Sequence, residues 1–477
     1  MNIVRGLRSL AVVAAVGLCA CAAVGPDYQR PSAAVPEQYK EMAGWKPIEP
    51  KPAASDRAWW SIFADPKLDE LERQVEVSNQ SLKAAEAAYR QALAIVAESR
   101  AGFAPTVTAG ASAQRAGQSS AGTTSVQNQF SASLAASWAP DVWGRIRRTV
   151  ESSVASAQAS NADLAAARLS LQATLATDYF ELRVADEMKH LFEQTVVGYQ
   201  AALEITRNQN QAGTAAGTDV ITAETLLEGA QAQLIGIGVQ RAQLEHAIGT
   251  LIGKTPDRFS IEPATLARDV PVAPTGMPST LLERRPDIAA AERAAAAASA
   301  QIGVATAAYY PDVTLSASLG VVGSALGGLL SASNAVWALG SQVAETVVDG
   351  GLRRAQVAAA RATYDESVAS YRQTVLSAFQ QVEDQLAALR ILEQQSQVQQ
   401  RAASSAREAV RLTTNQYEAG TVAYTSVVTV QAIALVDEEN LLTTLASRLS
   451  ASVALISALG GGWDAAMLAD GSGRSQP

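Results

Sequence analysis

The 477-residue sequence is poor in the residues and motifs that enzymes most often use. It contains two cysteines, Cys19 and Cys21, and two histidines, His190 and His246, neither of which has a second histidine four residues later. After Cys21 no thiol remains for a nucleophile or a thiolate metal site. There is no Gly-x-Ser-x-Gly or Gly-x-Gly-x-x-Gly motif, and GTLIGKT from Gly249 is one residue too short for a phosphate-binding loop. We therefore expect no catalytic residue, no metal site and no bound cofactor.

The charge balance argues against one class of partner. With 37 Lys and Arg against 46 Asp and Glu, the formal net charge is −9. Arg5 and Arg8 lie in the N-terminal segment, so its removal makes the remaining chain more acidic. Proteins that bind nucleic acid present basic surfaces to the phosphates. We expect no nucleic-acid partner.

The N-terminal segment has the pattern of an export signal. Arg5 and Arg8 precede an apolar run of about nine residues, Leu10 to Leu18, which is the length of a signal-peptide core and too short to span a bilayer. Cys19 and Cys21 follow directly, and a disulfide between residues so close together would be strained. An ordinary cleaved leader and a lipid-modification signal are both compatible with this position.

An internal repeat organises the rest of the chain. Several residues recur in a matching local sequence about 206 positions later, which indicates two copies of one unit. The proline-rich segment 256–280 connects the two copies. The matched pairs are Pro105 and Pro311, Arg147 and Arg353, and Gly213 and Gly420.

Each unit contains a long segment with helical character. No proline occurs between Asp141 and Thr255, which permits a helix of about 65 residues, roughly 100 Å long. In the second unit apolar residues recur at intervals of three, four or seven, which predicts a coiled-coil seam. The seam residues are Val357, Tyr364, Val368, Tyr371, Val375, Phe379, Val382, Leu386 and Leu389. We expect long helices over 141–210 and 351–417, and return helices over 219–250 and 425–459.

Before each long helix the period of the sequence changes to two. Apolar and small polar residues alternate over about 104–138 and about 311–345, which is the weak signal of membrane β-hairpins. Aromatic residues stand at the strand ends nearest the helices, where an interfacial girdle is expected: Phe103, Trp138, Tyr309 and Tyr310. A transmembrane helix is the competing interpretation for 312–345, since this stretch has no charge between Asp312 and Glu345. The corresponding part of the first unit contains Arg115, so a shared fold favours hairpins.

Four strands per chain cannot close a barrel, and a sheet edge exposed to lipid leaves backbone groups unpaired. The chain must therefore associate if the strands lie in a membrane. Two copies would give eight strands with a filled interior, and three would give twelve around a water-filled one.

The sequence around Cys21, Leu18-Cys19-Ala20-Cys21, resembles a bacterial lipobox, in which the chain is cut before the last cysteine and that thiol is acylated. The resemblance implies that Cys21 is the first residue of the mature protein and holds a covalent lipid. Ala22 is not the aspartate that resembles an inner-membrane retention signal, which favours the outer membrane.

Three further stretches resemble the TolC-like outer-membrane factor family, in its OprM-like lipoprotein branch of tripartite efflux systems. They are CAAVGPDYQRP from Cys21, Trp59-Trp60 with Asp65-Pro66 and Leu68, and LLERRPDIAAAERAAAAASAQIGVATAAYYPDVTL from Leu281 to Leu315. The resemblance implies a mainly α fold with a small membrane β part: long coiled-coil helices and two β-hairpins per protomer, with a trimeric 12-stranded β-barrel continued by an α-helical barrel.

The implied function is a passive exit duct for drugs or other small solutes in the outer membrane of a Gram-negative bacterium. The implied partners are two further copies in a homotrimer, a periplasmic adaptor protein, an inner-membrane transporter of the RND type and outer-membrane lipid. Two alternatives stay open: a conduit of a type I-like protein secretion system, and a structural coiled-coil lipoprotein of the envelope without a pore.

The expected organisation follows from the repeat and the resemblance together. It comprises a lipoprotein signal peptide (1–20), an N-terminal anchor and periplasmic segment (21–66), the first repeat (67–255), a linker (256–280), the second repeat (281–459) and a C-terminal tail (460–477).

The resemblance also implies functional residues where the long helices reverse. The adaptor-docking candidates are Gly213, Thr214, Gly420 and Thr421. A role only in capping the helices stays open as the alternative, since glycine readily adopts the positive φ of a helix end. The gate or aperture candidates are Asp219, Tyr417, Ser426 and Thr429. Many relatives have pore-facing aspartates in the second turn, whereas TVAYTSVVTVQ from Thr421 has no acid. We therefore expect weaker cation selectivity than in acid-ringed relatives.

Overall fold

The computed structural model describes residues 23–41, 58–120, 123–266, 269–271 and 278–468. In chain order its 3-10 helices (η), α-helices and β-strands are η1 (Trp59–Phe63), α2 (Pro66–Ser78), α3 (Gln80–Ala101), β1 (Thr106–Ser120), β2 (Thr123–Trp138), α4 (Arg145–Gln211), α5 (Gly217–Leu251), η2 (Pro256–Arg258), α6 (Pro278–Arg284), α7 (Pro286–Ala307), β3 (Asp312–Gly323), η3 (Ala332–Asn334), β4 (Ala335–Ala344), α8 (Leu352–Glu418), α9 (Tyr424–Ala458) and η4 (Ala465–Met467).

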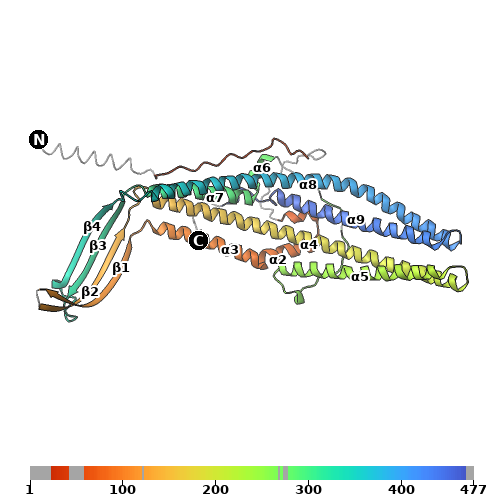
Figure 1. The fold of residues 1–477 in the computed structure, drawn as a ribbon, viewed down its shortest axis with the longest axis horizontal. Helices are drawn as coiled ribbons and strands as arrows, with labels where there is room; N and C mark the ends of the chain where they lie inside the picture. The colour runs from red at the N-terminus through yellow and green to blue at the C-terminus, as the bar shows by residue number, and fades with distance from the viewer. Residues whose placement is uncertain (1–22, 42–57, 121–122, 267–268, 272–277, 469–477) are drawn as a thin grey trace.

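The molecule is a long helical rod with a small sheet at one end (Figure 1). The α4–α5 and α8–α9 turns lie together at the opposite end. Helices α4 and α8 each have 67 residues, so each is about 100 Å long. This architecture confirms the predicted fold class, mainly α with a small β part.

The long helices begin slightly later than expected because an acid and a glycine shape each entry. The Asp141 carboxylate accepts hydrogen bonds from the backbone N–H groups of Ile146 (2.8 Å) and Arg147 (3.0 Å), and Gly144 has a φ of 81°. Residues 141–144 therefore form a turn. In the second repeat Asp349 likewise accepts from the N–H of Arg353, at 3.2 Å.

The first helical segment of each repeat is broken in two. The break in the first repeat was not predicted from the sequence. The Asn79 side chain accepts from the N–H of Leu82 (2.9 Å) and donates to the carbonyl of Leu251 (2.8 Å), so it caps α3 and ties it to the end of α5. In the second repeat Arg285 is extended because Pro286 disfavours a helical residue before it.

The four strands form one antiparallel sheet in the order β1-β2-β3-β4. Residues 312–323 and 335–344 are strands, so the transmembrane-helix interpretation of this stretch is wrong. Among the described helices, α9 is long and apolar enough to cross a membrane by composition. However, 56% of its most apolar window is buried inside the protein, which is typical of a core helix.

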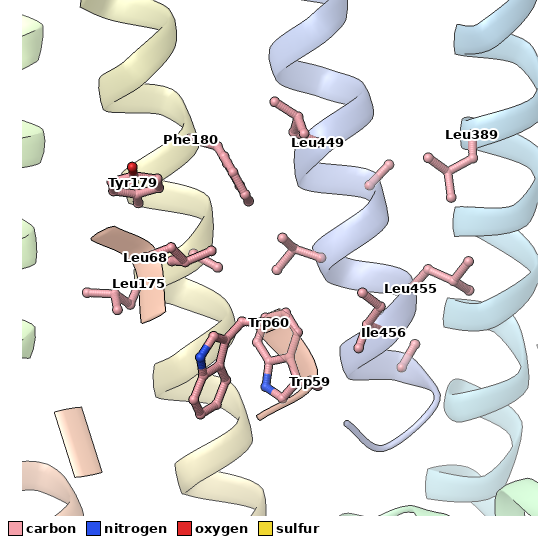
Figure 2. Packing of buried hydrophobic residues seen from close by; sticks show 14 of the residues in the cluster. Trp59, Trp60, Leu68, Leu175, Tyr179, Phe180, Leu389, Leu449, Leu455 and Ile456 are labelled. Atoms are coloured by element: carbon pink, nitrogen blue, oxygen red, sulfur yellow. The ribbon is translucent and has the colours of Figure 1, made fainter. Parts of the chain in front are cut away.

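The main core lies where η1 and α2 pack against α4, near α9 and α8 (Figure 2). Trp59 and Trp60 meet edge to face, with ring centroids 6.0 Å apart. Burial of each large apolar side chain contributes roughly 1.5–3 kcal/mol. Six of the nine predicted seam residues of α8 are buried: Tyr371, Val375, Phe379, Val382, Leu386 and Leu389.

One buried group opposes this packing. Glu72 of α2 is 0% exposed, and neither of its carboxylate oxygens has a hydrogen-bond partner among the described residues. An acid on each side of it along the chain has a partner on α4. The Asp65 carboxylate accepts a hydrogen bond from the Tyr179 hydroxyl, and Glu76 forms an ion pair with Arg168. Burial, with a smaller effect of the Glu76 carboxylate, raises the pKa of Glu72 to about 9. Its carboxyl is therefore neutral at pH 7.

We predict that Glu72 makes the fold less stable as the pH rises. Because the folded state holds this proton up to about pH 9 and the unfolded state releases it near 4.5, the stabilisation from the protonated group is complete below pH 4.5 and is lost as the pH rises through 9. Glu72→Leu should gain stability over the wild type by up to about 1.4 kcal/mol per pH unit within this window. Urea unfolding in detergent between pH 5 and 9 measures the difference. Glu70→Leu, at an exposed site on the same helix, is the control, and equal slopes for Glu72→Leu and wild type would contradict the prediction.

Candidate functional site

The two turns at the end of the rod have the same geometry. Gly213 and Gly420 have φ values of 75° and 73°, a conformation that favours glycine. The N–H of Thr214 donates to the carbonyl of Gln209, and that of Thr421 to Gln416, both at 2.9 Å. The two threonine hydroxyls donate to the same carbonyls, at 3.0 and 2.9 Å.

These four residues therefore cap the ends of α4 and α8. They are also exposed, and a Cβ added to either glycine would meet no atom within 4 Å. The turns are accessible to a partner, while their role in adaptor docking stays a prediction.

Next to the turns, a small apolar cluster joins the two helical hairpins. Its buried members are Leu203, Ala223, Tyr417, Tyr424 and Val427. The rings of Tyr417 and Tyr424 are 5.3 Å apart, and the Tyr417 hydroxyl lies 3.4 Å from the hydroxyl of Thr206 on α4. Because the Thr206 hydroxyl already donates to the carbonyl of Ala202, Tyr417 is the donor between them.

Tyr417 was a sequence candidate, whereas Tyr424 and Thr206 were missed. An aromatic residue in the first turn of α9, directly after the glycine turn, was the available signal for Tyr424. Nothing in the sequence marks Thr206, because threonines that bond to the preceding helical turn are frequent in this chain.

The other gate candidates divide into two groups. Asp219 is half-buried in the first turn of α5, where the helix dipole favours a carboxylate. Burial raises the pKa of Tyr424 to about 12, with smaller contributions from Tyr417, Tyr199 and Asp219, in that order. Asp219 and Tyr417 therefore gather around Tyr424. Ser426 and Thr429 are exposed on α9, and the Thr429 hydroxyl donates to the carbonyl of Thr425 at 2.8 Å.

At the other end of the helices, the N-terminal strap (residues 23–41) begins at the junction of sheet and rod. The N–H of Val24 donates to the carbonyl of Trp143 at 3.1 Å. Arg148, only 4% exposed, donates to the carbonyl of Val24 (3.1 Å) and to the carboxylate of Asp27 (2.8 Å). Cys21 lies outside the described residues, three positions before Val24.

The strap crosses α7 at a glycine pair. A Cβ on Gly25 would lie 2.4 Å from the Cα of Gly303, so only glycine fits this crossing. Further along, the Tyr28 hydroxyl donates to the Glu292 carboxylate at 2.6 Å, and Arg30 donates to the carbonyl of Leu282. The opening motif GPDYQRP and the run from Leu281 are therefore two sides of one contact.

Aromatic side chains surround this junction. Phe103, Trp138, Tyr309 and Tyr310 are each 39–43% exposed. Trp143 stacks on Tyr310 with a centroid distance of 4.9 Å. This arrangement is typical of the interfacial girdle of a membrane sheet.

Within the described residues, no group of three or more His, Cys, Asp or Glu side chains is placed to hold a metal ion.

Comparison with known proteins places this architecture in a family. The family model for "Outer membrane efflux protein" matches twice, over residues 71–254 and 277–461, which correspond to the two repeats. Among curated relatives, the probable efflux pump outer membrane protein TtgC of Pseudomonas putida is 31% identical over 96% of each chain. The pyoverdine export outer membrane protein OpmQ of Pseudomonas aeruginosa is 30% identical over 96% of this chain and 97% of its own length.

The tertiary structure agrees with these matches. The outer membrane channel MtrE of Neisseria gonorrhoeae, solved in its open state, superposes with a TM-score of 0.83 at 29% identity, over 93% of this chain and 99% of MtrE. Both repeats, the full length and the arrangement of sheet and rod match together, so the chain belongs to the outer membrane efflux protein family and is an outer-membrane efflux channel.

Proposed function

We propose that three copies of this chain form a passive exit duct, the outer-membrane part of a tripartite efflux pump. The observation that supports this most directly is a four-stranded sheet whose two edges have no partner strand within the described part of the chain, joined to a rod of helices about 100 Å long. In lipid the backbone groups of β1 and β4 at these edges need partners. Three copies supply twelve strands, enough for a water-filled barrel, and the rods continue it as a helical tube.

The duct itself catalyses no reaction. Energy for transport comes from an inner-membrane transporter of the RND type, and a periplasmic adaptor docks at the exposed turns around Gly213 and Gly420. In the arrangement of helices that the structure shows, the cluster of Tyr417 and Tyr424 holds the two helical hairpins of one chain together. A partner that binds an open arrangement more tightly shifts the population toward it.

Small solutes are the proposed cargo. The names of TtgC and OpmQ refer to an efflux pump and to pyoverdine export, which favours small molecules over secreted proteins. A structural envelope lipoprotein without a pore does not require a membrane sheet, so the four strands favour a channel over this alternative.

A lipid on Cys21 fits the position of the strap. Val24 is bound at the junction with the sheet, beside the aromatic girdle, so an acyl chain three residues earlier would lie close to the membrane surface. Two or more acyl chains hold a protein to a bilayer far better than one.

We predict that radiolabelled palmitate is incorporated into the wild-type chain and into Cys19→Ala, but not into Cys21→Ala. The two cysteines are the only thiols of the chain, so this pair of variants identifies the modified one. Label retained by Cys21→Ala would contradict the assignment.

We predict that Gly420→Leu abolishes efflux while trimers still assemble. The side chain would protrude from an exposed turn into open space, so it blocks docking, and the positive φ costs roughly 1–2 kcal/mol, too little to unfold the rod. Dye accumulation in cells that lack the endogenous channel measures efflux, and native electrophoresis measures assembly. Gly198→Leu, at an exposed helical glycine with open space around it, is the matched control. Loss of assembly together with efflux would assign Gly420 to folding instead.

We predict that Thr429→Asp increases block of the channel by polyvalent cations, because three added carboxylates around the aperture attract them. Ser447→Asp adds the same charge on α9 far from the turn and should leave block unchanged. Single-channel currents with and without hexamminecobalt measure the effect, and equal block in all three proteins would show that Thr429 does not face the aperture.

A further inference from the structure

The strand register separates the sheet into two chemically distinct faces. Because alternate residues point to opposite sides and paired residues share a side, each face can be followed across all four strands. One face is apolar and contains Val107 of β1, Phe130, Leu134 and Trp138 of β2, Leu315 and Leu319 of β3, and Trp337 and Leu339 of β4.

The opposite face contains small and hydroxyl side chains. Its rows across the strands are Thr106, Ser137, Ser316 and Gly340; Thr108, Ala135, Ser318 and Ala338; and Gly110, Ser133, Gly320 and Val336. Ser112 and Ser131 extend this face, with their hydroxyls 2.8 Å apart. We call it the hydroxyl face.

The apolar face has the height of a membrane. Phe130 to Trp138, both included, make nine residues of β2, which is about the length of a transmembrane strand. Trp138 belongs to the aromatic girdle, and Phe130 pairs with Gly323, the last residue of β3. The apolar face therefore contacts lipid, and the hydroxyl face lines the interior.

The hydroxyl face has no charge within this height. The four strands contain only two charged residues, Arg115 and Asp312. Arg115 lies on the same side of the sheet as the apolar face, but beyond Phe130, opposite Asn128. Asp312 lies on the same side as the hydroxyl face but beyond Trp138, at the helix-proximal end of β3, 3.8 Å from Arg145.

We propose that the membrane part of the duct is an electrically neutral pore lined by the hydroxyl face, which passes anionic, cationic and uncharged small solutes without selection by charge. This inference rests on the proposed trimeric duct. Rings of fixed charge on a pore wall select counter-ions, and the wall around Ser133 has none. With no side chain larger than valine in the three rows, it also offers little surface to retain a solute.

Two single-cysteine variants test the proposal in the full-length trimer, with Cys21 acylated. Ser133→Cys lies on the hydroxyl face and Ala132→Cys, its neighbour, on the apolar face. Each is treated with a cationic methanethiosulfonate (trimethylammonium-ethyl) and an anionic one (sulfonatoethyl), in salt of about 10 mM, where the Debye length is about 30 Å and wall charges act across the lumen. Mass spectrometry gives the rates, each divided by that reagent's rate with a small free thiol.

The expected result is that Ser133→Cys reacts with both reagents at corrected rates within about threefold of each other, since no wall charge biases either one. Ala132→Cys should not react measurably, because charged reagents do not enter lipid. A cationic preference of about tenfold or more would reveal an anionic lumen and overturn neutrality. Reaction at Ala132→Cys in place of Ser133→Cys would overturn the assignment of faces.

Failure of the proposed function gives a different result. A protein that is monomeric and conducts no ions in planar bilayers has no lumen, and both cysteines would then react alike in detergent. A conducting trimer with a strong charge preference at Ser133→Cys would leave the duct in place and refute only the neutral pore.

Discussion

Backbone hydrogen bonding at the sheet edges constrains the whole molecule. Among the residues that the structure describes, no other strand of the same chain pairs with the outer edge of β1 or of β4. In lipid each unpaired N–H or carbonyl group at these edges costs several kcal/mol, so the edges must meet those of other copies. Once three sheets close around an axis, the attached helices must surround the same axis. The helical tube and its turns, placed far from the membrane, follow from this closure.

The closed barrel continues into the helical tube only if the sheet and the rod of each chain are rigidly joined. Several polar contacts lie at the junction between them. Asp141 and Asp349 cap the entries of α4 and α8, and buried Arg148 binds the strap. The Gly25–Gly303 crossing brings the strap against α7. The strap follows Cys21 closely in the chain. A lipid on Cys21 would therefore attach the rod to the membrane through the same strap contacts that fix the junction of sheet and rod.

The sequence predicted the features that depend on period and repetition: the long helices, the hairpins and the two glycine turns. It failed where single side chains decide. Asn79 breaks a helix that composition alone would continue, and Gly144 delays the start of α4. Thr206 meets Tyr417 only through packing between α4 and α8, 211 residues apart in the chain, which no local pattern encodes. Glu72 has the spacing of a core position, but its burial without a partner becomes visible only in the packed structure.

The shared barrel is the central claim, and native mass spectrometry of the detergent-extracted mature protein tests it most directly. The account predicts a mass of three chains that persists on dilution in detergent. A stable monomer with its strands intact would contradict the account, because a single four-stranded sheet cannot satisfy its edges in lipid.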